Sequence, residues 1–159
     1  MHVHAEELRA LKSPRDAGER NRYRAVQFAH QPRWQAYGEI GDSWFGFDAM
    51  RELRNLPQLR LIPLAGHTRG HVGIAVDTGN GWLLHASDAY FFHGQMQQQP
   101  HCPPGLALSE RSAQADGPQR HRNAERLREL ATNTDVTIFA AHSPVELHRH
   151  QSDGGSGHR

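Results

Sequence analysis

The sequence predicts a single layered α/β domain, and three observations lead to this prediction. Short apolar segments with the composition of strands follow one another from residue 59 onward, and amphipathic segments with helical spacing stand before and after them. A turn signal, Thr-Gly-Asn-Gly over 78–81, joins two of these strands as a hairpin. The 159 residues fit one domain and are enough to bury a core, but the pattern alone does not fix the strand order.

The N-terminal part of the chain is expected to be largely helical. Val3-His4 has the character of a strand end that leads at once into an amphipathic helix, because apolar side chains then recur at helical spacing. We expect a second helix over 19–30 and a third over 48–55, the latter with Asp48 as its N-cap. An aromatic cluster between these two helices forms either plain core or the wall of a pocket for an apolar group. Its members are Trp34, Tyr37, Trp44, Phe45 and Phe47.

The rest of the chain alternates strands with helices. Residues 94–118 are rich in Gln, Pro and Gly and are expected to form a long surface loop, after which 120–131 is an amphipathic helix. The Gly- and Ser-rich end predicts a domain over 1–150 followed by a disordered polar tail over 151–159. Strands are expected over 59–64, 72–77, 82–86 and 135–141.

Composition and charge exclude several classes of function. The chain has 18 Lys and Arg against 17 Asp and Glu, a net charge of +1, and so lacks the basic field that nucleic-acid binding usually needs. No apolar run reaches the length of a membrane span, and the first residues lack the apolar stretch of a signal peptide. The single cysteine, Cys102, cannot form an intramolecular disulfide. We therefore expect a cytoplasmic protein that binds a small molecule, and neither nucleic acid nor a membrane.

Three side chains of metal-binding type stand directly after predicted strands. They are His67, Asp88 and His142, and a strand end is where a chain can project an imidazole or a carboxylate into a cleft. Two imidazoles and one carboxylate suit zinc, and also iron or manganese. Their separations match no short metal-binding motif, so ordinary loop residues are the alternative interpretation.

Three segments of the chain resemble motifs of the metallo-β-lactamase-fold hydrolases. Gly-His-Thr-Arg-Gly-His over 66–71 is similar to the Gly-His-Thr-Pro-Gly-His loop of glyoxalase II-like and lactonase-like enzymes. Residues 85–91 resemble the Gly-Asp segment of that family, and 139–143 resemble its final His-Asp segment, in the order of the family. The resemblance implies a partial αββα metallo-β-lactamase sandwich, corresponding to the C-terminal two-thirds of the fold, with mixed sheets and flanking helices.

The resemblance also implies a role for each candidate side chain. His67 would bind a first metal, His142 a second, and Asp88 would bridge the two, so that a hydroxide shared by the metals attacks a small ester, thioester or lactone. His71 would support the site without binding metal. Tyr90 would stabilise a substrate oxyanion, although its spacing departs by one residue from the lactonase pattern.

Three positions depart from the motifs of the family without removing a metal ligand. Arg69 stands where proline is usual, Ser87 where glycine is usual, and Ser143 where aspartate is usual.

The first metal motif of the family, His-X-His-X-Asp-His, is not found in the sequence. His2-Val3-His4 has the first spacing, but Ala5-Glu6 follows, so we expect both histidines to be structural. The chain is therefore expected to begin just after that motif, with Met1 an internal methionine or an alternative start of a longer protein.

Two hypotheses follow from this difference. Without the motif, each metal would have one histidine and a shared aspartate, whereas catalytic zinc normally has three protein ligands. Under the first hypothesis the chain belongs to a metal-dependent hydrolase that is active in a longer form, and the 159 residues alone are inactive or weak. Under the second it is a non-catalytic remnant or interaction module of the same fold. Under either hypothesis, the missing N-terminal strands predict self-association through an uncovered sheet edge.

Overall fold

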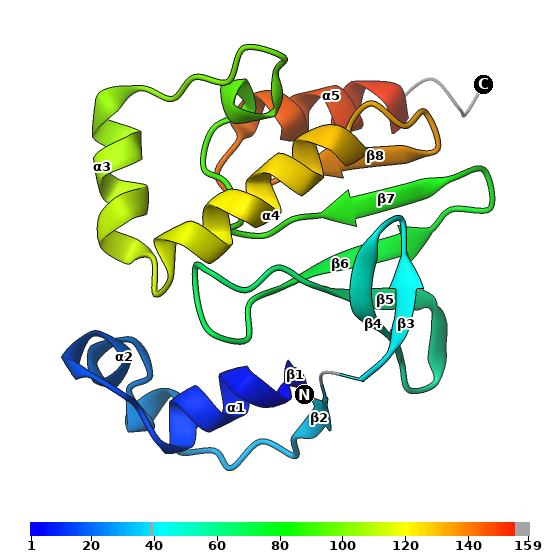
Figure 1. The fold of residues 1–159 in the computed structure, drawn as a ribbon. Coiled ribbons are helices and arrows are strands. Elements are labelled where there is room, and N and C mark those ends of the chain that lie inside the picture. Colours follow the sequence, from blue (N-terminus) through cyan, green and yellow to red (C-terminus); the bar gives the residue numbers. More distant parts are fainter. Residues whose placement is uncertain (39, 155–159) are drawn as a thin grey trace.

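A six-stranded mixed sheet organises the molecule (Figure 1), and the computed structural model describes residues 1–38 and 40–154. The strands keep their sequence order in the sheet, and neighbours are antiparallel except for the last two, which are parallel. A parallel pair needs a long crossover, which here contains α3 (Pro104–Ala113) and α4 (Gly117–Leu130). The strands are β3 (Asp42–Trp44), β4 (Phe47–Leu53), β5 (Leu56–Pro63), β6 (Val72–Asp77), β7 (Trp82–His85) and β8 (Val136–Phe139).

The N-terminal residues form a second, two-stranded parallel sheet with its own helices. The strand that leads directly into a helix at Val3-His4 is confirmed, and His4 caps that helix by accepting a hydrogen bond from the Glu6 amide. His2 is hydrogen-bonded to the Tyr37 hydroxyl, so both histidines have structural contacts, as predicted. The elements are β1 (His2–His4), α1 (Ala5–Lys12), α2 (Ala17–Arg22), the 3-10 helix η1 (Ala25–Phe28) and β2 (Gln35–Tyr37).

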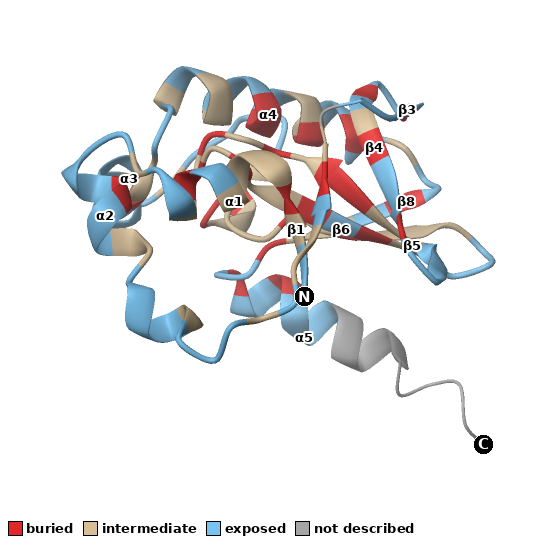
Figure 2. Ribbon diagram, turned by 90° about the horizontal axis from the view of Figure 1, so that it is seen from below, coloured by how far each residue is buried: buried red, intermediate tan, exposed pale blue. Residues whose placement is uncertain are grey.

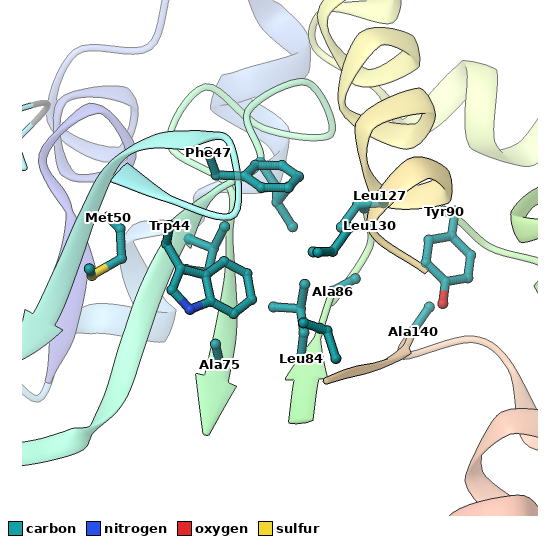
Figure 3. Packing of buried hydrophobic residues seen from close by; sticks show 14 residues of the cluster. Trp44, Phe47, Met50, Ala75, Leu84, Ala86, Tyr90, Leu127, Leu130 and Ala140 are labelled. Carbon is teal, nitrogen blue, oxygen red and sulfur yellow. The ribbon is translucent and has the colours of Figure 1, made fainter. Parts of the chain in front are cut away.

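The main core lies between the six-stranded sheet and α4. Leu127 and Leu130 of α4 pack against alternate residues of the strands, such as Ala75 and Leu84 (Figure 3). Buried residues of α4 recur three or four positions apart, which is the spacing of one helix face (Figure 2). Helix α4 therefore covers this side of the sheet along the main cluster.

The opposite face of the sheet is covered only in part. The register places Leu61 and Ile74 in one cross-strand row, and alternation turns both away from α4. Leu61 is buried against Tyr37 of β2, whereas Ile74 is 37% exposed. The two-stranded sheet thus protects the β5 side of this face and leaves the β6 side accessible.

The aromatic cluster is mostly core. Trp44 and Phe47 are buried in the main cluster and Tyr37 in the second one, whereas Phe45 is 42% exposed. Apolar packing against the sheet therefore accounts for most of these rings.

The helix predicted over 48–55 is wrong, because residues 48–53 belong to strand β4 and 54–55 form the turn that follows it. Its buried residues, Phe47, Met50 and Leu53, stand three apart, which imitates helical spacing. The cause is an irregular strand: Ala49 has φ of 61° and the pairing register with β3 shifts at this point. A bulge of this kind breaks the two-residue periodicity on which the recognition of strands depends.

The loop predicted over 94–118 is also partly wrong, because it contains most of the 3-10 helix η2 (His93–Met96) and all of α3. Pro104 is the first residue of α3, a position where proline is favoured because its missing N–H has no helical partner. Glu110 anchors this helix through its ion pair with Arg120, whose Nη1 lies 2.7 Å from the carboxylate.

Other predicted elements are close to the structure. The β6–β7 hairpin, the strand at β8 and the helix at α4 are confirmed, whereas the helix predicted over 19–30 is divided into α2 and η1. Helix α5 (Pro144–Gly154) continues through 151–154, which were predicted to be tail, and the remaining tail, 155–159, lies outside the described residues. Among the helices described, none is long and apolar enough to cross a membrane.

Candidate metal centre

The strand directions bring the three predicted ligands to one edge of the sheet. β5, β7 and β8 run the same way, because β6 is antiparallel to both of its neighbours and β8 is parallel to β7. His67 follows β5, Asp88 follows β7 and His142 follows β8, so all three stand at the carboxyl ends of these strands, on the left in Figure 1. This topology explains how residues far apart in the sequence meet.

The two oxygens of Asp88 face different histidines. Oδ2 lies 3.6 Å from Nε2 of His67, and Oδ1 lies 3.1 Å from Nε2 of His142. Two donor atoms bound to the same tetrahedral zinc lie about 3.3 Å apart, so each histidine–oxygen pair has a separation near that of two ligands of one ion. Within the described part of the chain, no three His, Cys, Asp or Glu side chains surround a common point. The residues therefore fit two half-sites that share Asp88, each with one histidine.

The His67 imidazole is suited to bind a cation at Nε2. Its side chain is only 15% exposed, and burial lowers its pKa to about 4, although the Asp88 carboxylate opposes the shift. The ring is therefore neutral near pH 7. Nδ1 is buried without a hydrogen-bond partner among the described residues. A neutral ring with its proton on Nδ1 presents the Nε2 lone pair to the Asp88 oxygen, and a cation between the two would remove the repulsion.

The loop that carries His67 is held by contacts with three helices. Gly66 has φ of 139°, and a Cβ at this residue would lie within 3.0 Å of the Arg120 backbone in α4. The amide of Gly70 donates to the Glu7 carboxylate of α1, and Nη1 of Arg22 in α2 donates to the His67 carbonyl over 2.7 Å. Glycine is thus needed here for close backbone approach.

Arg69, which replaces the usual proline, adds another contact to this loop. Its Nε lies 2.7 Å from the Glu19 carboxylate of α2, and Nη2 donates to the Ser13 carbonyl. Both charged side chains are largely buried, so this ion pair is shielded from solvent. The substitution therefore exchanges a rigid ring for a link to the N-terminal helices.

His71 lies behind Asp88 and has both ring nitrogens engaged. Nδ1 donates to the Leu64 carbonyl over 2.9 Å, and Nε2 accepts from the Asp88 amide over 3.1 Å. Burial lowers the pKa of His71, which favours the neutral tautomer that this pattern requires. The ring thus links the end of β5 to the backbone of Asp88.

His142 is more open than His67. Its side chain is 55% exposed, and its ring packs 4.6 Å from the Phe91 ring, which also lies 5.9 Å from His67. The preceding residue, Ala141, donates its amide to the Ser87 carbonyl over 2.9 Å. Ser87 has φ of 52°, in the left-handed region that favours glycine, the residue usual at this position of the motif.

The expected role of Tyr90 at a substrate oxyanion is not supported by its position. Tyr90 is 0% exposed, and its hydroxyl donates to the Glu146 carboxylate, 3.0 Å from Oε1 and 3.2 Å from Oε2. Figure 3 shows the ring within the main core. Because Tyr90 is fully enclosed, it has a packing role and does not face a substrate.

Several residues around the centre were not predicted from the sequence. Glu7, Arg22, Phe91 and Glu146 all contact a ligand or its loop, and most of these contacts join distant parts of the chain. The segment similar to the Gly-Asp motif includes Phe91, but the motif gave no indication of its ring contacts.

Comparison with known proteins shows the fold of the chain. No protein-family model matches the chain. Two curated relatives, from Mycobacterium bovis and Mycobacterium tuberculosis, are both named "Probable metallo-hydrolase", and each is 34% identical over 147 residues. The match covers 91% of this chain and 47% of each relative, so the chain spans about half their length.

Solved structures are similar to the chain over about half of their own length. One is the hydrolase AbOPH in the β-lactamase superfamily, at 19% identity and a TM-score of 0.59, covering 91% of this chain and 48% of that one. Another is AidC, a dizinc quorum-quenching lactonase in complex with a product, at 14% identity and a TM-score of 0.57, covering 90% and 47%. The chain therefore has the metallo-β-lactamase fold, as expected, and contains about half of it.

Proposed function

We propose that the chain carries two half-sites of a dinuclear metal centre, in a hydrolase that acts on a small ester, thioester or lactone. The observation that supports this most is the Asp88 carboxylate, which faces His67 with one oxygen and His142 with the other. A complete centre needs further ligands, which the described residues do not supply, so we expect the 159 residues alone to be weak or inactive. The relatives named metallo-hydrolases and the dizinc lactonase support a metal-dependent reaction.

Each of the four residues of the proposed site has a defined role. Asp88 holds the two half-sites together, His67 and His142 each give one imidazole nitrogen, and His71 fixes the Asp88 backbone. A pair of divalent cations bound there supplies Lewis acidity, which activates a water and polarises the carbonyl of the substrate. Zinc is our first choice of metal, with iron and manganese as alternatives. We also propose a cytoplasmic location, in which the free Cys102 stays reduced.

Metal titration of the 159-residue chain tests this proposal. Zn²⁺, Fe²⁺, Mn²⁺ and the spectroscopic probe Co²⁺ are each titrated by calorimetry, and the Co²⁺ absorption spectrum reports the ligands. We expect weak binding that Asp88→Asn abolishes and Asp48→Asn, at an exposed carboxylate of β4, leaves unchanged. If wild type and Asp88→Asn give the same titration, the proposed centre is wrong.

We propose self-association as the second candidate function, because one sheet face is incompletely covered. The apolar surface that we propose for this contact is the sheet face around Ile74, a side chain that is 37% exposed. A non-catalytic remnant would use this surface to pair with a second copy of itself. Light scattering should then show an oligomer that Ile74→Lys dissociates, whereas Ile40→Lys, at a loop position that is 85% exposed, has no effect. Turnover of a lactone or thioester by the 159-residue chain would exclude the non-catalytic interpretation.

A further inference from the structure

We infer that Glu146 is a positioning residue that sets His142 against Asp88, with Tyr90 as its partner. The inference rests on the proposed metal centre and concerns how its more open half is held. Glu146 lies in the first turn of α5, and nothing in the sequence motifs marks it as part of a site.

One carboxylate is bonded to both segments that carry these ligands. The Tyr90 hydroxyl donates to Glu146, and the Ala140 amide donates to Glu146 Oε2 over 3.0 Å. Tyr90 stands two residues after Asp88, and Ala140 stands two residues before His142. Glu146 therefore fixes the distance between the segment that carries Asp88 and the segment that carries His142, two residues away from each ligand.

The buried environment of the Glu146 carboxylate strengthens these hydrogen bonds and leaves the two groups few other partners. Glu146 is 6% exposed and Tyr90 is 0% exposed, so neither group exchanges its partner readily for water. The Tyr90 hydroxyl lies within hydrogen-bond distance of both oxygens of the carboxylate, 3.0 Å from Oε1 and 3.2 Å from Oε2. The first turn of α5 also favours a negative charge at this place.

The position of His142 depends on this network because its own side chain has little cover. The ring is 55% exposed and packs against the Phe91 ring. Besides Glu146, the backbone bonds from Ala141 to Ser87 and from Ala86 to Phe139 join its loop to the Asp88 segment. A buried carboxylate costs desolvation free energy that an apolar pair in the same space would avoid. Its presence is explained by the Ala140 amide, which needs an acceptor, and by the geometry that the two bonds impose.

Two substitutions with a matched control test the inference. Tyr90→Phe removes one hydroxyl and keeps the ring, and Glu146→Gln removes the charge and leaves a single acceptor oxygen. The control is Tyr37→Phe, since Tyr37 is also buried and its hydroxyl is bonded to His2 and to the Arg54 amide, in the other core cluster. Loss of a buried hydroxyl bond is thus common to both tyrosine variants, and only one of them lies beside the centre.

The first readout is the affinity of the 159-residue chain for Co²⁺, with its visible spectrum. We expect about tenfold weaker binding for Glu146→Gln, as is usual when a group that orients a ligand is changed, a smaller loss for Tyr90→Phe and none for Tyr37→Phe. Equal affinities in all four proteins would overturn the inference while leaving the proposed centre intact.

The second readout is amide hydrogen exchange at Ala140 and Ala141 without metal. Both variants at the network should exchange faster at these amides than wild type, and Tyr37→Phe should not. Hydrogen exchange tests the inference even if the wild-type chain binds no metal. Failure to bind metal would overturn the proposed function, but not the inference about Glu146. Unchanged exchange in Tyr90→Phe and Glu146→Gln would show that the network does not hold the His142 loop.

Discussion

The two loops that carry the histidines differ in how firmly the fold holds them. The loop at 66–71 is enclosed by α1, α2 and α4, and its His67 side chain is 15% exposed. The segment at 140–143 is joined to its neighbours by a few hydrogen bonds, and its His142 side chain is 55% exposed. Fold stability and metal binding should therefore be coupled at the first loop and separable at the second.

The largest effect should come from crowding the first loop. In Gly70→Ala, the added Cβ would lie within 3.0 Å of the Glu7 backbone nitrogen, so backbone of α1 or of the loop has to move. We expect a loss of about 3 kcal/mol in the free energy of unfolding, measured by urea denaturation.

Gly105→Ala provides the control for this substitution. Gly105 lies in α3 with open space around its Cα, so alanine there should be neutral or add about 0.5 kcal/mol through helix propensity. A Gly70→Ala protein as stable as wild type would show that the first loop is not tightly enclosed.

A second, intermediate effect should separate the two histidines. His67→Ala removes a largely buried ring that packs against Phe91 and His71, so we expect a loss of about 1 to 2 kcal/mol in the free energy of unfolding. His142→Ala removes a mainly exposed ring and should change it by less than about 0.5 kcal/mol. Both variants should lose metal binding in the titration described above.

If His67→Ala and His142→Ala lower the free energy of unfolding by the same amount, the proposed difference between the two loops is wrong. His121→Ala, at a ring that is 69% exposed on α4, shows the effect of an unrelated surface histidine on both measurements.

The sequence predicted the elements whose signals are local. The β6–β7 hairpin has its alternating apolar residues and its Gly-rich turn in one continuous segment, and the structure agrees there. The predictions failed where a local signal was misleading: a bulge at Ala49 gave β4 helical spacing, and Pro104 marked the beginning of α3 although it suggested a loop.

The candidate site, like the fold, could be predicted only where its signals are local in the sequence. His67, Asp88 and His142 could be found because each follows a strand and matches a motif, and the structure brings them together. The residues that hold them could not be found, because Arg22 contacts a residue 45 positions away and Tyr90 one 56 positions away. No local pattern encodes such pairs, which exist only once the strand order is formed.

The smallest effect should be a gain of stability in the second loop region. Ser87 has φ of 52°, a conformation that costs a residue with a Cβ about 1 kcal/mol or more, and Ser87→Gly removes that strain. The unfolded chain gains entropy from glycine, so we expect a net increase of about 0.5 kcal/mol in the free energy of unfolding. Ser109→Gly, at an exposed site inside α3, should have the opposite sign and cost about 0.5 kcal/mol.

Ser87→Gly also shows how far the second loop tolerates change. The bond from the Ala141 amide uses the backbone carbonyl of Ser87, which glycine retains, so Co²⁺ affinity should stay within about twofold of wild type. Weaker Co²⁺ binding together with higher stability would mean that the strained serine itself holds Asp88 against His142. In that case the second half-site would depend on backbone strain as well as on its few hydrogen bonds, and the contrast with the enclosed first loop would be smaller than the structure indicates.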